Sequence, residues 1–187
     1  MLKPHTSTVS SIRVAVMLAA VALLTVAAFG STASAATIKM LGPKGGIRFE
    51  GPKTVLAGEE LKVVNKSNPK QIGPHTFSLV TQASLPKTQN AFRSCFTPNH
   101  ICKAIALWHG VKGNGPVKVN PVDAGNPGWD TMGSKKTEGD SWFTGNKPGT
   151  SYAQPVTADT SAGPTRLYFL CAIHPEMQGS INVLPAG

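Results

Sequence analysis

Three side chains with metal-binding atoms lie within seven residues near the end of the chain. They are Cys171, His174 and Met177, which offer a thiolate, an imidazole and a thioether. One Cys, two His and a weakly bound axial Met form a ligand set that suits copper in electron transfer. This segment supplies three of the four groups, so a second His must come from elsewhere in the chain.

The residues on either side of this segment are typical of β-strands. Residues 166–170 form a short β-prone run that ends at Cys171, and residues 179–184 form a second run after Met177. A loop held between two strands has little freedom to rearrange. We therefore expect the ligand loop to be rigid, as a site that must keep its geometry requires.

The spacing Cys-x-x-His-Pro-x-Met-x-Gly, from Cys171 to Gly179, resembles the short ligand loop of the cupredoxins. This family of small blue-copper proteins includes plastocyanin, pseudoazurin and amicyanin. Its fourth ligand is a His on an earlier strand, usually after Pro and before Asn. The segment Gly73-Pro74-His75-Thr76-Phe77 matches this pattern, except that Thr76 replaces the Asn whose side chain helps to tie the two ligand loops together.

The resemblance covers residues 36–82 and 138–187 and implies both a fold and a function. The implied fold is an all-β, Greek-key β-sandwich. The implied cofactor is one type 1 copper ion, and the implied function is to carry single electrons between redox proteins. The implied metal ligands are His75, Cys171, His174 and Met177.

Residues 37–82 favour the same fold independently of the ligands. Apolar and polar residues alternate over residues 37–41 and 47–50, and residues 61–65 form a further β-prone run. Turn-forming residues separate these runs. Short strands at this density predict an antiparallel sandwich, and no long capped helical pattern occurs after residue 35.

Residues 1–35 have the features of a secretory signal peptide. Lys3 and Arg13 are basic, residues 14–29 are apolar apart from one Thr, and Ala33-Ser34-Ala35 is a small-residue cleavage site. An uncleaved membrane anchor is the alternative, although 16 apolar residues are fewer than the roughly 20 that a spanning helix prefers. We expect an exported protein, periplasmic or extracellular at the cell surface, with one domain over residues 36–187.

Loss of the signal peptide removes two basic residues and no acidic ones, so the net charge changes from +9 to +7. This charge predicts solubility, and it also favours acidic redox partners and a weak attraction to an anionic cell surface. Nucleic acid is a poor candidate because the Lys residues are scattered rather than interleaved with aromatic residues. We expect the domain to act as a monomer.

Residues 83–137 form a long insertion, rich in Gly, Pro and Asn, between His75 and the ligand loop. It contains Cys95 and Cys102, and exported chains favour disulfides. With Cys171 assigned to the metal, these two cysteines are predicted to pair with each other. The alternative is that one of them pairs with Cys171 and that no copper site exists, which three cysteines alone cannot decide. Residues 103–108 fit either a short helix or a strand.

The sequence also bears on two other classes of function. A multicopper enzyme needs a second copper site built from several more His residues, and only His100 and His109 remain after the signal peptide and the ligands are set aside. Catalysis is therefore not expected. A non-redox protein that stores or delivers copper, or a copper-free binding module, stays open. The binding surface of such a module would use Trp108, Trp129 and Trp142.

Overall fold

The computed structural model describes residues 35–113 and 117–187. The predicted signal peptide therefore lies outside the described residues, apart from its last residue. Within the described ranges no helix is both long enough and apolar enough to cross a membrane.

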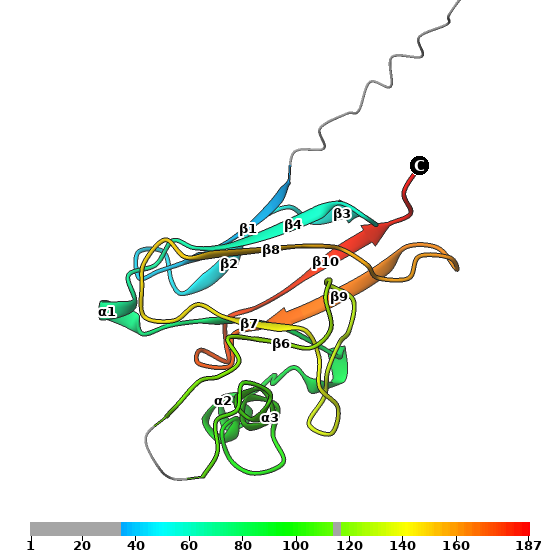
Figure 1. The fold of residues 1–187 in the computed structure, drawn as a ribbon. Coiled ribbons are helices and arrows are strands. Elements are labelled where there is room, and N and C mark those ends of the chain that lie inside the picture. Colours follow the sequence, from blue (N-terminus) through cyan, green and yellow to red (C-terminus); the bar gives the residue numbers. More distant parts are fainter. Residues whose placement is uncertain (1–34, 114–116) are drawn as a thin grey trace, which may run out of the picture. The chain divides into compact units, whose positions relative to one another are not determined.

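Two β-sheets make up the body of the domain (Figure 1). The four-stranded sheet has, in spatial order, β2 (Arg48–Glu50), β1 (Ala36–Leu41), β4 (Glu60–Asn65) and β8 (Ser151–Pro155). The six-stranded sheet has β3 (Thr54–Leu56), β10 (Gln178–Leu184), β9 (Thr165–Leu170), β5 (Thr76–Val80), β7 (Ser141–Phe143) and β6 (Asp123–Ala124). The chain crosses between the sheets several times, and the predicted all-β sandwich is confirmed. The predicted antiparallel pairing is not complete, because β1 pairs with β4 and β3 pairs with β10 in parallel.

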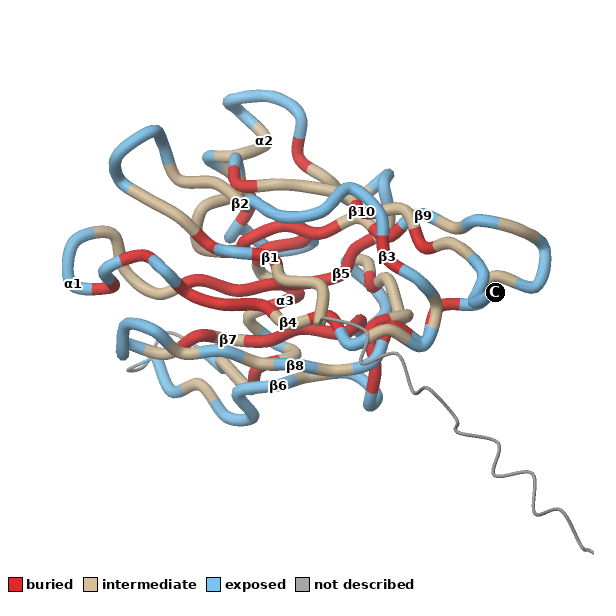
Figure 2. The backbone as a smooth tube through the Cα atoms, turned by 90° about the horizontal axis from the view of Figure 1, so that it is seen from above, coloured by how far each residue is buried: buried red, intermediate tan, exposed pale blue. Residues whose placement is uncertain are grey.

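The main core lies between the two sheets. Alternation along β1 buries Ile38 and Met40 while Lys39 between them stays exposed, as the two-residue period of a strand requires. The rings of Phe77 and Phe169, from neighbouring strands β5 and β9, lie 4.7 Å apart. Figure 2 shows the buried residues along the strands and the exposed residues in the connecting loops. This packing fixes the strand ends that carry the predicted ligands.

Short helices occur in the connections between strands, where the sequence predicted loops except at residues 103–108. α1 (Pro69–Ile72) is a single turn in the connection before His75. In the insertion, the 3-10 helix η1 (Gln82–Ser84) is followed by α2 (Gln89–Ser94) and α3 (Ile101–Trp108). Residues 103–108 are therefore helical, which decides between the two predicted alternatives.

The insertion helices pack on the outer face of the six-stranded sheet. A second buried cluster joins Ile105 of α3 to Val80 of β5 and Leu170 of β9, and it also includes Ala172 of the ligand loop. Cys95 and Cys102 lie within this cluster, and they form the predicted disulfide, which is thereby confirmed. The insertion is thus anchored by apolar contacts directly beside the predicted ligands.

The predicted tryptophan surface is wrong. Trp129 is completely buried in the main core, where its indole N–H donates to the carbonyl of Leu61 at 3.1 Å and its ring meets Phe77 edge-on at 5.0 Å. Trp142 is 5% exposed and stacks on Tyr152. Burying a large aromatic ring removes much apolar area from water, so both rings pack in the core although their sequence neighbours are typical of exposed loops.

The disulfide should contribute to the free energy of unfolding. A Cys95→Ala, Cys102→Ala double variant should lose about 2–3 kcal/mol of unfolding free energy, because the crosslink restricts the unfolded chain. Urea unfolding of oxidised wild type and variant measures this loss. Peptide mapping under non-reducing conditions is the accompanying control. A link from Cys171 to either of the other cysteines would contradict the disulfide and leave no free thiol for a metal.

Candidate metal centre

The two segments that carry the predicted ligands meet at one edge of the six-stranded sheet. β5 and β9 are antiparallel neighbours with Ser78 opposite Leu170. The residue that precedes β5, His75, therefore lies next to the residue that follows β9, Cys171. Both are completely buried. The sequence separates them by 95 residues, and strand pairing brings them together.

Three donor atoms converge at this edge. The Sγ of Cys171 lies 3.6 Å from the Nδ1 of His75 and 3.6 Å from the Nδ1 of His174. All three donors lie within 4.8 Å of one another. Transition-metal bonds to N and S are about 2.0 and 2.3 Å long, so a single ion in a trigonal N₂S site places N and S about 3.7 Å apart. The observed donor set therefore fits one metal ion.

His75 is oriented by a serine that the sequence analysis did not single out. The Ser67 hydroxyl donates to Asn65 Oδ1 at 2.6 Å, so its oxygen accepts the Nε2–H of His75 at 2.9 Å. This places the proton on Nε2 and leaves the Nδ1 lone pair facing Cys171. The backbone of His75 is also fixed, because its N–H donates to the Thr144 hydroxyl at 2.9 Å.

His174 is oriented by a backbone carbonyl. Its Nε2 lies 2.9 Å from the carbonyl oxygen of Ile72, at the end of α1. A carbonyl can only accept, so Nε2 carries the proton and Nδ1 is again the free donor atom. Gly73 ends α1 with φ +80°, a conformation that favours glycine, and it turns the chain toward His75. The short helix thus contributes to both histidines.

Thr76 joins the two ligand segments. Its hydroxyl accepts the N–H of Ala172 at 2.8 Å, and its own N–H points at Cys171 Sγ at 3.3 Å. This is the tie that the family makes with Asn. A threonine hydroxyl provides the same acceptor at this position, so the departure from the family pattern leaves the connection intact.

Met177 closes the ligand loop through its backbone. Its N–H donates to the carbonyl of His174 at 2.8 Å, and its carbonyl accepts the N–H of Cys171 at 2.9 Å. Its side chain is 1% exposed and belongs to the same core cluster as Cys171. The loop therefore holds Met177 beside the cysteine, and axial ligation by its sulfur stays a prediction.

Burial shifts the titration of the donors in opposite directions. It raises the pKa of the Cys171 thiol to about 11, against the stabilising effect of the N–H of Thr76. It lowers the pKa of His75 to about 4, with a further contribution from the positive charge of His174. In the metal-free protein the thiol is therefore protonated and His75 is neutral. Metal binding must displace the thiol proton.

The structure brings together His75, Cys171 and His174, with Met177 alongside. Among the described residues, the other two histidines lie apart from this group. His100 is exposed and bonds to Thr97. His109 is buried in the insertion. Ser67 and Ile72 escaped the sequence analysis. Ser67 lies in an Asn- and Pro-rich turn with no metal-site motif, and Ile72 acts through its backbone, which no side-chain pattern can reveal.

The lowered pKa of His75 predicts acid sensitivity of the metal-free protein. The unfolded chain binds a proton near pH 6.5, whereas native His75 does so only near pH 4. Stability should therefore be constant above about pH 6.5 and fall below it, by roughly 3 kcal/mol at pH 4 from this residue alone. Urea unfolding between pH 7.5 and 4 measures the slope. His75→Gln should flatten it, whereas a steep slope retained in that variant would assign the effect elsewhere. The exposed His100→Gln is the matched control.

Comparisons with known proteins add nothing to this description. No protein-family model matches the chain, and no curated protein matches it. The solved structure of dithionite-reduced auracyanin from the photosynthetic bacterium Roseiflexus castenholzii is similar at 17% identity and a TM-score of 0.39, over 81% of this chain and 95% of that chain. The fold and the site rest on this chain's own sheets and side chains. The two-sheet sandwich and the His-Cys-His cluster beside Met177 match the fold and the donor set that the sequence resemblance implied.

Proposed function

We propose that the protein binds one copper ion in a type 1 site and carries single electrons between redox proteins. The observation that supports this most directly is the convergence of two imidazole Nδ1 atoms on the Cys171 sulfur, with Met177 alongside. A bound copper ion would supply a reversible one-electron couple. His75, Cys171 and His174 would hold it, and Met177 would be its weak axial ligand.

The protein's own contribution is to keep these donors in place. Both histidines have Nε2 bonded, to Ser67 and to the carbonyl of Ile72, so neither ring can rotate without losing a hydrogen bond. Such partners of metal-bound histidines fix the tautomer and the orientation of the ring. A site that changes little between two oxidation states needs this rigidity. Fast electron exchange is the function that such a site serves best.

The burial of the donors argues against copper delivery. His75 and Cys171 are completely buried, and the loop between Cys171 and Met177 is closed by two backbone hydrogen bonds. A protein that hands its metal to a partner needs ligands that the partner can reach. These ligands favour retention of the metal, and with it the electron carrier over the storage or delivery alternative.

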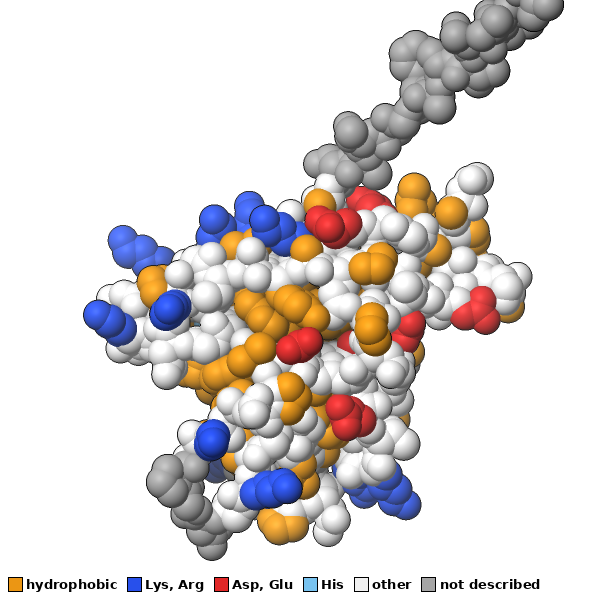
Figure 3. Space-filling view, viewed as in Figure 1, with side chains coloured by type: hydrophobic (Ala, Val, Ile, Leu, Met, Phe, Trp, Pro, Cys, Tyr) orange, Lys and Arg blue, Asp and Glu red, His pale blue; other side chains and the backbone are white. Residues whose placement is uncertain are grey.

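We further propose that the protein works outside the cytoplasm. The Cys95–Cys102 disulfide is typical of oxidising compartments, which agrees with the signal peptide that the sequence predicts. In Figure 3 Lys and Arg side chains lie mainly around the edges of the face shown, and Asp and Glu side chains lie beside the hydrophobic ones nearer its middle. The basic edges and the net charge of +9 favour an acidic redox partner.

Spectra of the copper-loaded protein test the proposal. Wild type should absorb strongly in the red through charge transfer from the thiolate to copper. Cys171→Ser should abolish this band, because the band requires the sulfur. Met177→Leu should keep the band and raise the reduction potential, because a donor that stabilises cupric copper is lost. A wild-type protein that binds copper without the band would contradict the type 1 site. An unchanged potential in Met177→Leu would exclude Met177 as the axial ligand.

Electron exchange should occur at the edge where His174 approaches the surface. His174, Pro74 and Pro175 are half-buried there, as is Ile72, whose carbonyl holds the His174 ring. Ile72→Glu should slow exchange with an acidic redox partner at least tenfold, because it places a like charge at the docking edge. Stopped-flow kinetics measures the rate, and the absorption band shows whether the site is intact.

The matched control for this variant is Leu56→Glu. Leu56 is exposed and pairs with Leu184 at the opposite end of β10. Leu56→Glu introduces the same charge far from the ligand loop and should leave the rate of electron exchange unchanged. Equal slowing by both variants would mean that net charge alone matters, and exchange would then not be localised at His174.

A further inference from the structure

Four buried polar side chains connect the insertion to the candidate metal centre. His109 follows α3, and its Nε2 lies 2.8 Å from the hydroxyl of Ser141 on β7. The Ser141 oxygen lies 2.7 Å from that of Ser78, which in turn lies 3.0 Å from the Thr76 hydroxyl on β5. All four residues are at most 4% exposed. We call Ser141, Ser78 and Thr76 the hydroxyl chain.

The hydroxyl chain ends at the ligand cysteine. The Thr76 hydroxyl accepts the N–H of Ala172, the residue after Cys171, and the Thr76 backbone N–H points at the cysteine sulfur. Because the Thr76 oxygen already accepts this N–H, the direction of its own O–H depends on Ser78. A change at the far end of the chain can therefore alter the hydrogen bonding of the thiolate.

The far end of the chain is a group that can gain a proton. His109 Nδ1 lies 2.9 Å from the carbonyl oxygen of Pro121, and since a carbonyl only accepts, Nδ1 carries a hydrogen. The other nitrogen, Nε2, faces Ser141. It accepts from that hydroxyl when the imidazole is neutral and donates to it when the imidazole is protonated.

Each hydroxyl has one hydrogen, so the whole chain runs in one of two directions. With His109 protonated, Ser141 donates to Ser78 and Ser78 donates to Thr76. The Thr76 hydrogen is then free to turn to Cys171, whose pKa is raised by burial and lowered by hydrogen bonding from the Thr76 side chain. The Ser78 donor geometry toward Thr76 matches this direction. With His109 neutral, Ser141 donates to its Nε2, and Ser78 then has to donate to Ser141 for that contact to stay a hydrogen bond. This direction requires Thr76 to reorient and donate to Ser78, because in the structure Ser78 is the donor to Thr76.

We propose that His109 is a positioning residue that, through the hydroxyl chain, determines whether Thr76 donates a hydrogen bond to the Cys171 thiolate. This inference rests on the proposed copper function and adds a control of its reduction potential. A hydrogen bond to a ligand sulfur withdraws electron density and favours the less positive metal. Protonation of His109 should therefore raise the reduction potential.

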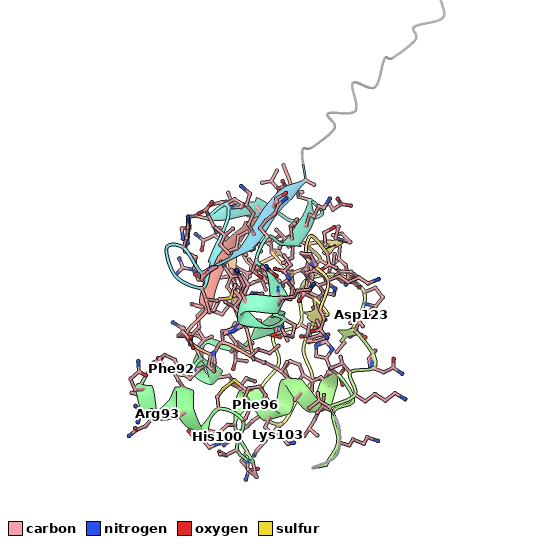
Figure 4. The ribbon with its side chains drawn as sticks, turned by 90° about the vertical axis from the view of Figure 1, so that its left-hand side faces the viewer. Phe92, Arg93, Phe96, His100, Lys103 and Asp123 are labelled. Atoms are coloured by element: carbon pink, nitrogen blue, oxygen red, sulfur yellow. A yellow bond between two sulfur atoms is a disulfide. The ribbon has the colours of Figure 1, made fainter. Side chains whose placement is uncertain are left out.

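Several charged groups surround His109. Burial lowers its pKa from the ordinary value of 6.5, and the carboxylates of Asp123 and Glu138 oppose this shift. Lys103 on α3 lines the same apolar cavity as His109 and adds positive charge. Figure 4 shows Lys103 among the insertion helices and Asp123 above them, near the sheet. The net effect on His109 is a lowered pKa, so this imidazole takes up its proton below pH 6.5.

The experiment measures the reduction potential of the copper-loaded protein between pH 8 and 4.5. In wild type the potential should rise as the pH falls, because the reduced protein binds the His109 proton more tightly than the oxidised protein, by about fivefold or more. His109→Gln should remove this rise. His100→Gln is the matched control, since it removes an exposed histidine of the same insertion, and it should behave as wild type.

Two further variants separate the hydroxyl chain from the charge of His109. Ser78→Ala and Ser141→Ala keep the histidine but interrupt the hydroxyl chain at different links. The test needs only one of these two variants to fold. Either should reduce the pH dependence as His109→Gln does. Full pH dependence in a folded chain-breaking variant would overturn the proposal, because the effect would then act through space.

The metal-free protein provides a readout that does not require copper. The amide signal of Ala172 reports on the Thr76 hydroxyl and should follow the titration of His109 in an NMR pH series. Other titrating groups affect wild type and His109→Gln alike, so the difference between the two series isolates His109. No difference would overturn the inference. If copper-loaded wild type lacks the thiolate band, the proposed function fails, and this series still decides whether His109 acts on the ligand loop.

Discussion

The surrounding structure conforms to one constraint, which is that a sulfur and an imidazole are buried at one end of a sandwich with a second imidazole half-buried beside them. Burial raises the pKa of Cys171 to about 11, so a bare thiolate would be strongly disfavoured there. The protein partly offsets this cost with the N–H of Thr76, which points at the sulfur. A cation at the converging donors would supply the remaining stabilisation. The site therefore suits a bound metal better than a reactive thiol, which would require a lowered pKa.

The same constraint explains the polar side chains around the site. An imidazole buried without a partner would lose the hydrogen bonds that water provides, so each ring nitrogen needs a defined role. Ser67 and the carbonyl of Ile72 take the two Nε2–H groups, and the Nδ1 atoms are left for the metal. The one-turn helix α1 helps to orient both histidines. It places the Ile72 carbonyl over His174, and its glycine cap directs the chain into His75.

The sequence predicted the strands and the donor residues because both are encoded locally. Two-residue alternation identifies β1 and β2, and the spacing of Cys171, His174 and Met177 is visible within one loop. The partners of the ligands could not be predicted, because a backbone carbonyl and a turn serine carry no pattern of their own. Trp129 was misassigned for a related reason. Its neighbours are turn residues, and only tertiary packing brings it from the insertion into the core.

The insertion is joined to the ligand loop by two different kinds of contact. Apolar packing around Ile105 includes Ala172, next to the ligand cysteine. The buried hydroxyl chain from His109 reaches the same residue through Thr76. Apolar contacts fix position but are indifferent to protonation, whereas a buried hydrogen-bond chain transmits the state of its end group, because every hydroxyl must reorient together. The two contacts therefore have different roles. The helices hold the ligand loop in place, and in our proposal the hydroxyl chain makes the hydrogen bonding of Cys171 depend on the protonation of His109.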